Sequence, residues 1–361
     1  MKLPPISYHD YLKIDQLLGC QVLRSEQVKL PAHDEHLFII VHQCYELWFK
    51  QIIKEIDSAI KIMNSERINE NDMGLIVSRF ERIKQIQKVM DMQIDVLETM
   101  TPMDFLEFRD LLLPASGFQS FQFKLFENKM GLRAEDRIVY NNVRYTEHFE
   151  DKSSQTLKES ETQPSLFSVV EKWLERTPFL QDASFDFWSS YKQAVEKMFV
   201  LETEMIKENP LLNEEAKARN YKIMEESQKI FAGLFSESEF NLGKKQGHWR
   251  LSHKAILAAL FIHLYRDMPI LHLPYRLLST LKDIDENLTY WRYRHALMAQ
   301  RMLGTKVGTG GSSGSKYLKD STEKHKIFQD FFQLTTFFIP RSKLPELPND
   351  LTIKLDFYYK G

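Results

Sequence analysis

The sequence has few of the features that mark disulfide-rich, nucleic-acid-binding or membrane-spanning proteins. Only two of its 361 residues are cysteines, Cys20 and Cys44, which excludes a disulfide framework and favours a reducing compartment. Its 48 basic and 50 acidic residues leave a net charge of −2, without the basic excess of a nucleic-acid footprint. The longest continuous apolar run, Ala255 to Ile262, is far shorter than the roughly 20 residues that span a bilayer.

Signals for secretion, for β-strands and for common catalytic folds are also missing. The opening residues, MKLPPISYHDYLKID, contain no apolar signal-peptide core, so we expect a cytoplasmic protein. No strand-like alternation stands out, and neither a Cys-x-x-Cys nor a Gly-x-Ser-x-Gly motif occurs. We therefore expect an all-α fold that forms one large helical body.

Helical periodicity is the dominant pattern in the chain. Thr101, Pro102 and Asp104 form a good helix start, and Asn213 caps a later helix. The ranges that we expect to be helical are 36–63, 71–100, 101–113, 165–176, 185–208, 213–235, 251–266, a helix starting near Leu281, and an aromatic helix around 328–337.

The expected domain organisation is one helical body with additions. Residues 1–30 form an N-terminal arm, 31–340 a single domain and 341–361 a tail. Residues 147–247 are expected to be a helical insertion within that domain. Its polar start, up to Pro164, is expected to be an exposed loop.

One histidine, His295, interrupts an apolar helix face. Periodicity alone favours a core histidine there, with metal ligation as the alternative. A single imidazole on an apolar face would suit haem better than structural zinc, which needs four ligands. The other members of this face are Ile284, Leu288, Trp291, Met298 and Met302.

Three further features could belong to a site. The loop Gly304–Gly314 carries glycine and hydroxyl residues, which suit either an anion cradle or a flexible surface loop. His42 lies one helical turn from Phe38, in a site wall or in the core. Arg109 lies one turn from Phe105, as a carboxylate fork or as a surface ion pair with Glu107, Asp110 or another acid.

Four long motifs closely resemble the tryptophan 2,3-dioxygenase family, and the resemblance runs from about residue 8 to residue 340. The motifs are HDEHLFIIVHQCYELWFKQI (33–52), DFLEFRDLLLPASGFQSFQF (104–123), WLERTP (173–178) and WRYRHALMAQRMLGTKVGTGGSSG (291–314). The resemblance implies an all-helical homotetramer with one haem b per subunit. It also implies cleavage of the indole C2–C3 bond of L-tryptophan by O2, giving N-formyl-L-kynurenine, the first step of the kynurenine pathway.

The resemblance also implies roles for individual residues. His295 would be the proximal haem ligand, and His42 the distal histidine that accepts the indole N–H. Arg109 would hold the substrate carboxylate, and Thr309 the carboxylate and ammonium. Other substrate-binding residues would be Phe38, Ile39, Ile40, Val41, Phe105, Ser116 and Gly117, with Tyr8, Tyr11 and Leu12 completing a neighbouring subunit's pocket. The alternatives are a related haem-dependent aromatic monooxygenase and a non-enzymatic haem sensor.

Overall fold

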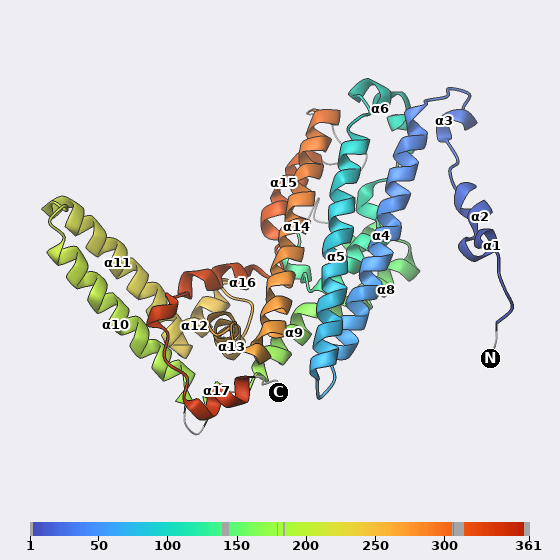
Figure 1. Cartoon of the computed structure of the whole chain (residues 1–361). Helices are drawn as coiled ribbons and strands as arrows, with labels where there is room; N and C mark the ends of the chain where they lie inside the picture. The colour runs from blue at the N-terminus through green and yellow to red at the C-terminus, as the bar shows by residue number, and fades with distance from the viewer. Residues whose placement is uncertain are drawn as a thin grey trace. The chain divides into compact units, whose positions relative to one another are not determined.

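The chain is all-α, as the sequence predicts. A computed structural model describes residues 3–138, 144–178, 180–182, 185–304, 306 and 314–356 (Figure 1). Within these ranges the only strands are β1 (Gln181–Asp182) and β2 (Phe185–Asp186), which pair antiparallel. The chain divides into two compact units, and the long helices α4, α5 and α14 have residues in both.

The first unit comprises residues 1–55, 83–163 and 286–326. It contains the parts of α4, α5 and α14 that carry the predicted site, and these three helices lie side by side (Figure 1). Its helices are α1 (Tyr8–Leu12), α2 (Ile14–Leu18), α3 (Arg24–Gln27), most of α4 (Asp34–Met63), the later part of α5 (Glu70–Leu97), α6 (Pro102–Arg109), η1 (Asp110–Leu112), η2 (Gly117–Gln119), α7 (Phe121–Met130), η3 (Ala134–Asp136), η4 (Tyr145–His148), α8 (Asp151–Thr162), the later part of α14 (His272–Leu303) and α15 (Gly314–Lys324).

The second unit comprises residues 56–82, 164–285 and 327–361. The apolar run noted in the sequence lies in its helix α13, where Ala255, Ile256 and residues 258–262 are all fully buried. Its helices are the end of α4, the start of α5, α9 (Leu166–Glu175), α10 (Phe187–Glu208), α11 (Glu214–Phe235), α12 (Glu237–Lys245), α13 (His253–Leu264), η5 (Pro269–Leu271), the start of α14, α16 (Gln329–Gln333), η6 (Leu334–Phe337), η7 (Arg341–Lys343) and α17 (Asn349–Leu355).

The predicted helix start at Thr101 is confirmed and has a reciprocal capping box. The Asp104 amide donates to Thr101 Oγ1 at 3.3 Å, and the Thr101 amide donates to Asp104 Oδ2 at 2.9 Å. These bonds satisfy two backbone donors at the start of α6. The cap therefore fixes where α6 begins, and with it the positions of Phe105 and Arg109.

The polar stretch from residue 147 to residue 164 is not an exposed loop, so that prediction was wrong. It contains the end of η4 and then helix α8, whose Leu157 is fully buried. Asn128 of α7 donates to the Leu157 carbonyl at 3.3 Å and to Ser160 Oγ at 2.8 Å. Only a narrow face of α8 is buried, and most of that face is serine, which left no apolar periodicity to detect.

Helix α14 begins at His272, well before the predicted start near Leu281. Pro274 is its third residue, although proline was expected to interrupt the helix. The first four N–H groups of a helix have no intrahelical acceptor, so a proline in the first turn removes no helical bond. The helix that carries His295 is therefore 32 residues long.

Candidate active site

Phe38 and His42 lie one turn apart on α4, and their rings are in contact, with centroids 4.0 Å apart. His42 Nδ1 is 2.7 Å from the Phe38 carbonyl oxygen. A carbonyl only accepts, so Nδ1 carries the proton in this bond. In the neutral ring Nε2 is then left with a lone pair, which makes it an acceptor for an N–H group.

The surroundings of His42 keep its imidazole neutral. Burial lowers the pKa of His42, and the bond to Phe38 opposes this shift only in part. The side chain is nevertheless exposed to solvent in this chain. His42 is therefore neutral at pH 7.

Helix α6 adds two aromatic rings beside Phe38. The Phe105 and Phe38 rings are stacked with centroids 5.9 Å apart, and Phe108 contacts both rings at 5.5 Å. Phe108 is fully buried. It anchors the other two rings, which keep accessible surface. The sequence reasoning missed Phe108, although its place three residues after Phe105 puts it on the same side of α6.

Arg109 is the last residue of α6, one turn after Phe105. Its Nη1 is 3.2 Å from Asp110 Oδ1, the surface pair that the sequence offered as an alternative. The Arg109 side chain is 17% exposed but that of Asp110 is 81% exposed. A pair with so exposed a partner contributes about 0–1 kcal/mol, so the Asp110 pair holds Arg109 only weakly.

Ser116 and Gly117 lie in a compact turn with space around it. The Phe118 amide donates to Ser116 Oγ at 3.3 Å, and the Ser116 amide donates to Gln119 Oε1 at 3.2 Å. A Cβ placed on Gly117 would meet no described atom within 4 Å, and its φ is not positive. The backbone there does not require glycine, so what glycine provides is room.

The end of this turn is tied to the helix that carries His42. Ser120 Oγ donates to Glu46 Oε1 at 2.6 Å, and Glu46 lies one turn after His42 on α4. Ser120 Oγ also accepts from the Phe123 amide at 3.2 Å and caps α7. Burial raises the pKa of Glu46, and the bond from Ser120 opposes that shift. Sequence reasoning missed this link, because the two residues are 74 positions apart.

His295 is in α14 and is stacked on Trp291, with ring centroids 5.6 Å apart. Among the described residues neither of its ring nitrogens makes a hydrogen bond. Burial, and secondly the charge of His42, lower the pKa of His295 to about 4. The two imidazoles are therefore close enough to interact electrostatically, and His295 is a neutral base with a free lone pair.

Trp291 is a second residue that the functional reasoning missed. Its ring contacts Tyr45 at 5.7 Å, Phe49 at 6.2 Å and Phe123 at 5.6 Å between centroids. It precedes His295 by four residues on the same helix face, so the spacing that singled out His295 also pointed to it.

The structure thus brings part of the predicted set together within the first unit. Phe38, His42 and Phe105 are in one cluster of contacting rings, and His295 interacts with His42. Ile39, Ile40 and Val41 follow Phe38 on α4, with Val41 buried. Thr309 lies outside the described residues.

The three arm residues remain apart from these contacts. Tyr8, Tyr11 and Leu12, on α1, are 77%, 72% and 42% exposed. Exposed apolar side chains grouped on a short helix are typical of a surface that binds a partner.

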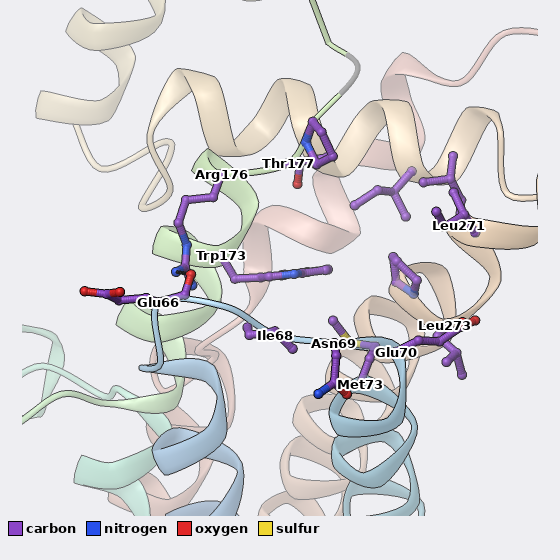
Figure 2. Close-up of a pocket in the computed structure, with 14 residues that line it drawn as sticks. Glu66, Ile68, Asn69, Glu70, Met73, Trp173, Arg176, Thr177, Leu271 and Leu273 are labelled. Carbon is purple, nitrogen blue, oxygen red and sulfur yellow. Dashed lines mark hydrogen bonds between the residues drawn. The ribbon is translucent and has the colours of Figure 1, made fainter. Parts of the chain in front are cut away.

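A separate pocket of about 380 Å³ lies within the second unit (Figure 2). Trp173 projects into it, and Arg176 beside it donates to the backbone carbonyls of Met63, Ser65 and Glu66 at 2.9–3.2 Å. These bonds give the arginine of the WLERTP motif a structural role, in holding the connection between α4 and α5. None of the predicted site residues lines this pocket.

Over the described ranges, no helix combines the length and the apolarity that a bilayer crossing requires. In the same ranges no three His, Cys, Asp or Glu side chains are grouped so as to hold a metal ion.

Comparison with known proteins identifies the family. The family model described as tryptophan 2,3-dioxygenase matches residues 4–338. A tryptophan 2,3-dioxygenase of Bdellovibrio bacteriovorus is 54% identical over 359 residues, covering 99% of this chain and all of the relative. One of Alteromonas mediterranea is 47% identical over 99% of this chain and 98% of its own length, and one of Dictyostelium discoideum is 46% identical over 98% and 88%. The chain belongs to the tryptophan 2,3-dioxygenase family.

Proposed function

We propose that this chain is a haem-dependent dioxygenase that cleaves the indole C2–C3 bond of L-tryptophan with O2, giving N-formyl-L-kynurenine. The observation that carries the proposal is the pair of interacting neutral histidines, His295 and His42, with His42 against the Phe38 ring that stacks on Phe105. The family membership supports the same reaction.

The residues present fit haem b, one per chain. His295 supplies one neutral imidazole with no hydrogen bond among the described residues. A lone axial histidine suits haem, whereas a metal held by side chains alone needs several ligands. Aromatic side chains around Trp291 provide an apolar surface next to that ligand. When bound, haem supplies the redox chemistry by which O2 is activated.

The protein's own part in the reaction is to bind and orient tryptophan. His42 Nε2 would accept the indole N–H, because Nδ1 is already committed to the Phe38 carbonyl. Phe38 and Phe105 would wall the indole ring and exclude water. Arg109, together with Thr309, would hold the amino-acid end. Holding the substrate at both ends fixes which indole bond faces the cofactor.

Product identification tests the proposal directly. Reduced holoprotein supplied with air and L-tryptophan should give N-formylkynurenine, with both added oxygen atoms from ¹⁸O2. A monooxygenase would instead leave a hydroxylated indole carrying one labelled atom. A product with one labelled atom, or no product at all, would contradict the proposal.

The pH profile should show that His42 works as a neutral acceptor. Its pKa lies below the ordinary value of about 6.5, so kcat/KM for tryptophan should stay level as the pH falls through 6.5. It should fall only at lower pH, where protonation of Nε2 removes the acceptor. A haem spectrum at each pH serves as the control for ligand loss. In His42→Asn, whose side chain cannot titrate, kcat/KM should not show this fall at low pH. If the fall is unchanged in that variant, another group causes it.

We further propose a homotetramer in which the arm of one subunit completes the pocket of another. The support is the exposure of Tyr8, Tyr11 and Leu12 in the single chain. Deleting residues 1–12 should then lower turnover at least about tenfold while haem content stays at the parental level. Leu18→Ser is a matched control, because Leu18 is 70% exposed on the neighbouring helix α2. Parental activity in the truncated protein would disprove the shared pocket.

A further inference from the structure

A cluster of ion pairs fixes the residue that directly precedes His295. Arg294 Nη1 is 3.3 Å from Asp91 Oδ2, and Arg294 Nη2 is 2.5 Å from Asp95 Oδ1 and 3.6 Å from Glu98 Oε2. Asp91 and Asp95 lie one turn apart on α5, and Glu98 follows the end of that helix. One guanidinium on α14 is thus held by three carboxylates from one region of the chain.

The cluster is withdrawn from solvent more than an ordinary surface pair. The side chains of Arg294, Asp91 and Glu98 are 18%, 26% and 25% exposed, and only Asp95 is mostly exposed. Nη1 also donates to the Asp91 backbone carbonyl at 3.3 Å. With both terminal nitrogens bonded, the planar guanidinium has a defined orientation, which the point charge of a lysine would not have.

The same turn of α5 is also linked to α14 through Tyr45 of α4. Tyr45 Oη donates to the Met90 carbonyl, one residue before Asp91, at 2.7 Å. The Tyr45 ring packs on Trp291 with centroids 5.7 Å apart, and Trp291 stacks on His295 at 5.6 Å. The position before His295 and the position one turn before it are therefore both fixed relative to α5.

A third contact holds α14 without Arg294. Arg292 is buried and donates to Glu127 Oε1 of α7 at 2.7 Å and to the His325 carbonyl at 3.1 Å. This pairing, with the packing of Trp291, would keep α14 folded and in place if Arg294 were lost. The Arg294 cluster adds an anchor on another side of α14, because residues two apart lie about 200° apart around a helix axis, and anchors on two sides oppose rotation of the helix.

We propose that Arg294 is a positioning residue for His295, fixing the rotation of α14 and so the direction of the imidazole toward haem. The proposal rests on the proposed function, since it takes His295 to be the haem ligand. Arg294 need not contact haem or tryptophan. It acts through the helix backbone, as the outer partners of a metal ligand commonly do.

The experiment compares Arg294→Ala, Arg294→Lys and Arg301→Ala as holoproteins. Arg301 is a matched control, because it is an exposed arginine two turns further along α14. The readouts are the iron–histidine stretching band of the ferrous protein and the rate of haem transfer to apomyoglobin. Arg294→Ala should shift or broaden the band and raise the haem-loss rate about tenfold. Arg294→Lys should give a band and a haem-loss rate between those of Arg294→Ala and the parent. Arg301→Ala should have the parental band and the parental haem-loss rate.

A parental band and a parental haem-loss rate in Arg294→Ala would overturn the positioning role. If Arg294→Ala fails to fold, Asp95→Asn replaces it, since it removes one carboxylate and leaves the guanidinium two others. It should shift the band in the same direction by less, and an unchanged band would again overturn the role. His295→Ala separates the two proposals. Retention of the parental band in that variant would defeat the haem assignment itself.

Discussion

Replacing His295 with alanine should abolish haem binding while leaving the protein folded. The imidazole is a neutral base on α14, and burial keeps its pKa at about 4, so it can ligate iron throughout the neutral range. The purified variant should show no Soret absorbance above background, even after incubation with excess haem. Its helical circular dichroism should equal that of the parent apoprotein.

The stability of the apoprotein makes this expectation sharper. His295 has no hydrogen bond among the described residues, and an enclosed polar group without a partner costs about 1–3 kcal/mol. Its removal should therefore leave the thermal midpoint of the apoprotein unchanged or raise it. A residue kept for packing would give the opposite result.

His263 is a matched control for this experiment. It is also an enclosed histidine whose pKa burial lowers, but its Nδ1 donates to the Ala259 carbonyl at 2.7 Å. It lies in the second unit, where its ring contacts the rings of Tyr275 and Phe338. His263→Ala should lower the thermal midpoint and keep the haem spectrum, the reverse of His295→Ala.

Chemical rescue completes the test of His295. His295→Gly leaves a gap of the right size for free imidazole, so adding imidazole should restore a histidine-like spectrum. Full haem content in His295→Ala without imidazole would remove this residue from the cofactor site.

Local signals in the sequence were enough to place most helices of this fold. The capping residues Thr101 and Asn213 mark helix starts, and the structure has both caps. Patterns failed where burial was narrow or polar. Helix α8 buries serines along with Leu157, and the first turn of α14 tolerates Pro274. The buried face of α8 has no apolar period to detect. The sequence pattern also did not show that Pro274 lies in the first turn of a helix instead of interrupting one.

The candidate site shows a similar limit. His295 and Trp291 share one helix face, and Phe38 and His42 share another, so short-range spacing finds each pair. Spacing cannot show that the two faces meet, or that Ser120 reaches Glu46 from 74 residues away. It is the long family motifs that predict one site built from these segments. The structure contributes the ring contacts, the tautomer of His42 and the space at Gly117.

Arg109→Ala should lower kcat/KM for tryptophan about 10²–10³-fold while haem content stays parental. Arg109 lies at the end of α6, and its ion pair with the 81% exposed Asp110 is weak, so a substrate carboxylate would be a better partner than Asp110. Removing one member of an enclosed hydrogen-bonded charge pair costs roughly 2–5 kcal/mol, which corresponds to this loss. The loss should appear mainly as a raised KM, because Arg109 holds the amino-acid end and not the indole.

The substrate itself provides the decisive control for Arg109. Tryptamine lacks the carboxylate, so the parent should use it far less well than tryptophan, and Arg109→Ala should remove most of that preference. Arg109→Lys should have a preference for tryptophan between those of the parent and Arg109→Ala, because lysine keeps the charge but not the bidentate geometry of the guanidinium. Asp110→Asn should leave KM nearly unchanged, since an exposed partner contributes little. If Arg109→Ala still preferred tryptophan over tryptamine by the parental factor, the carboxylate would be held elsewhere, and the glycine loop around Thr309 would be the next segment to test.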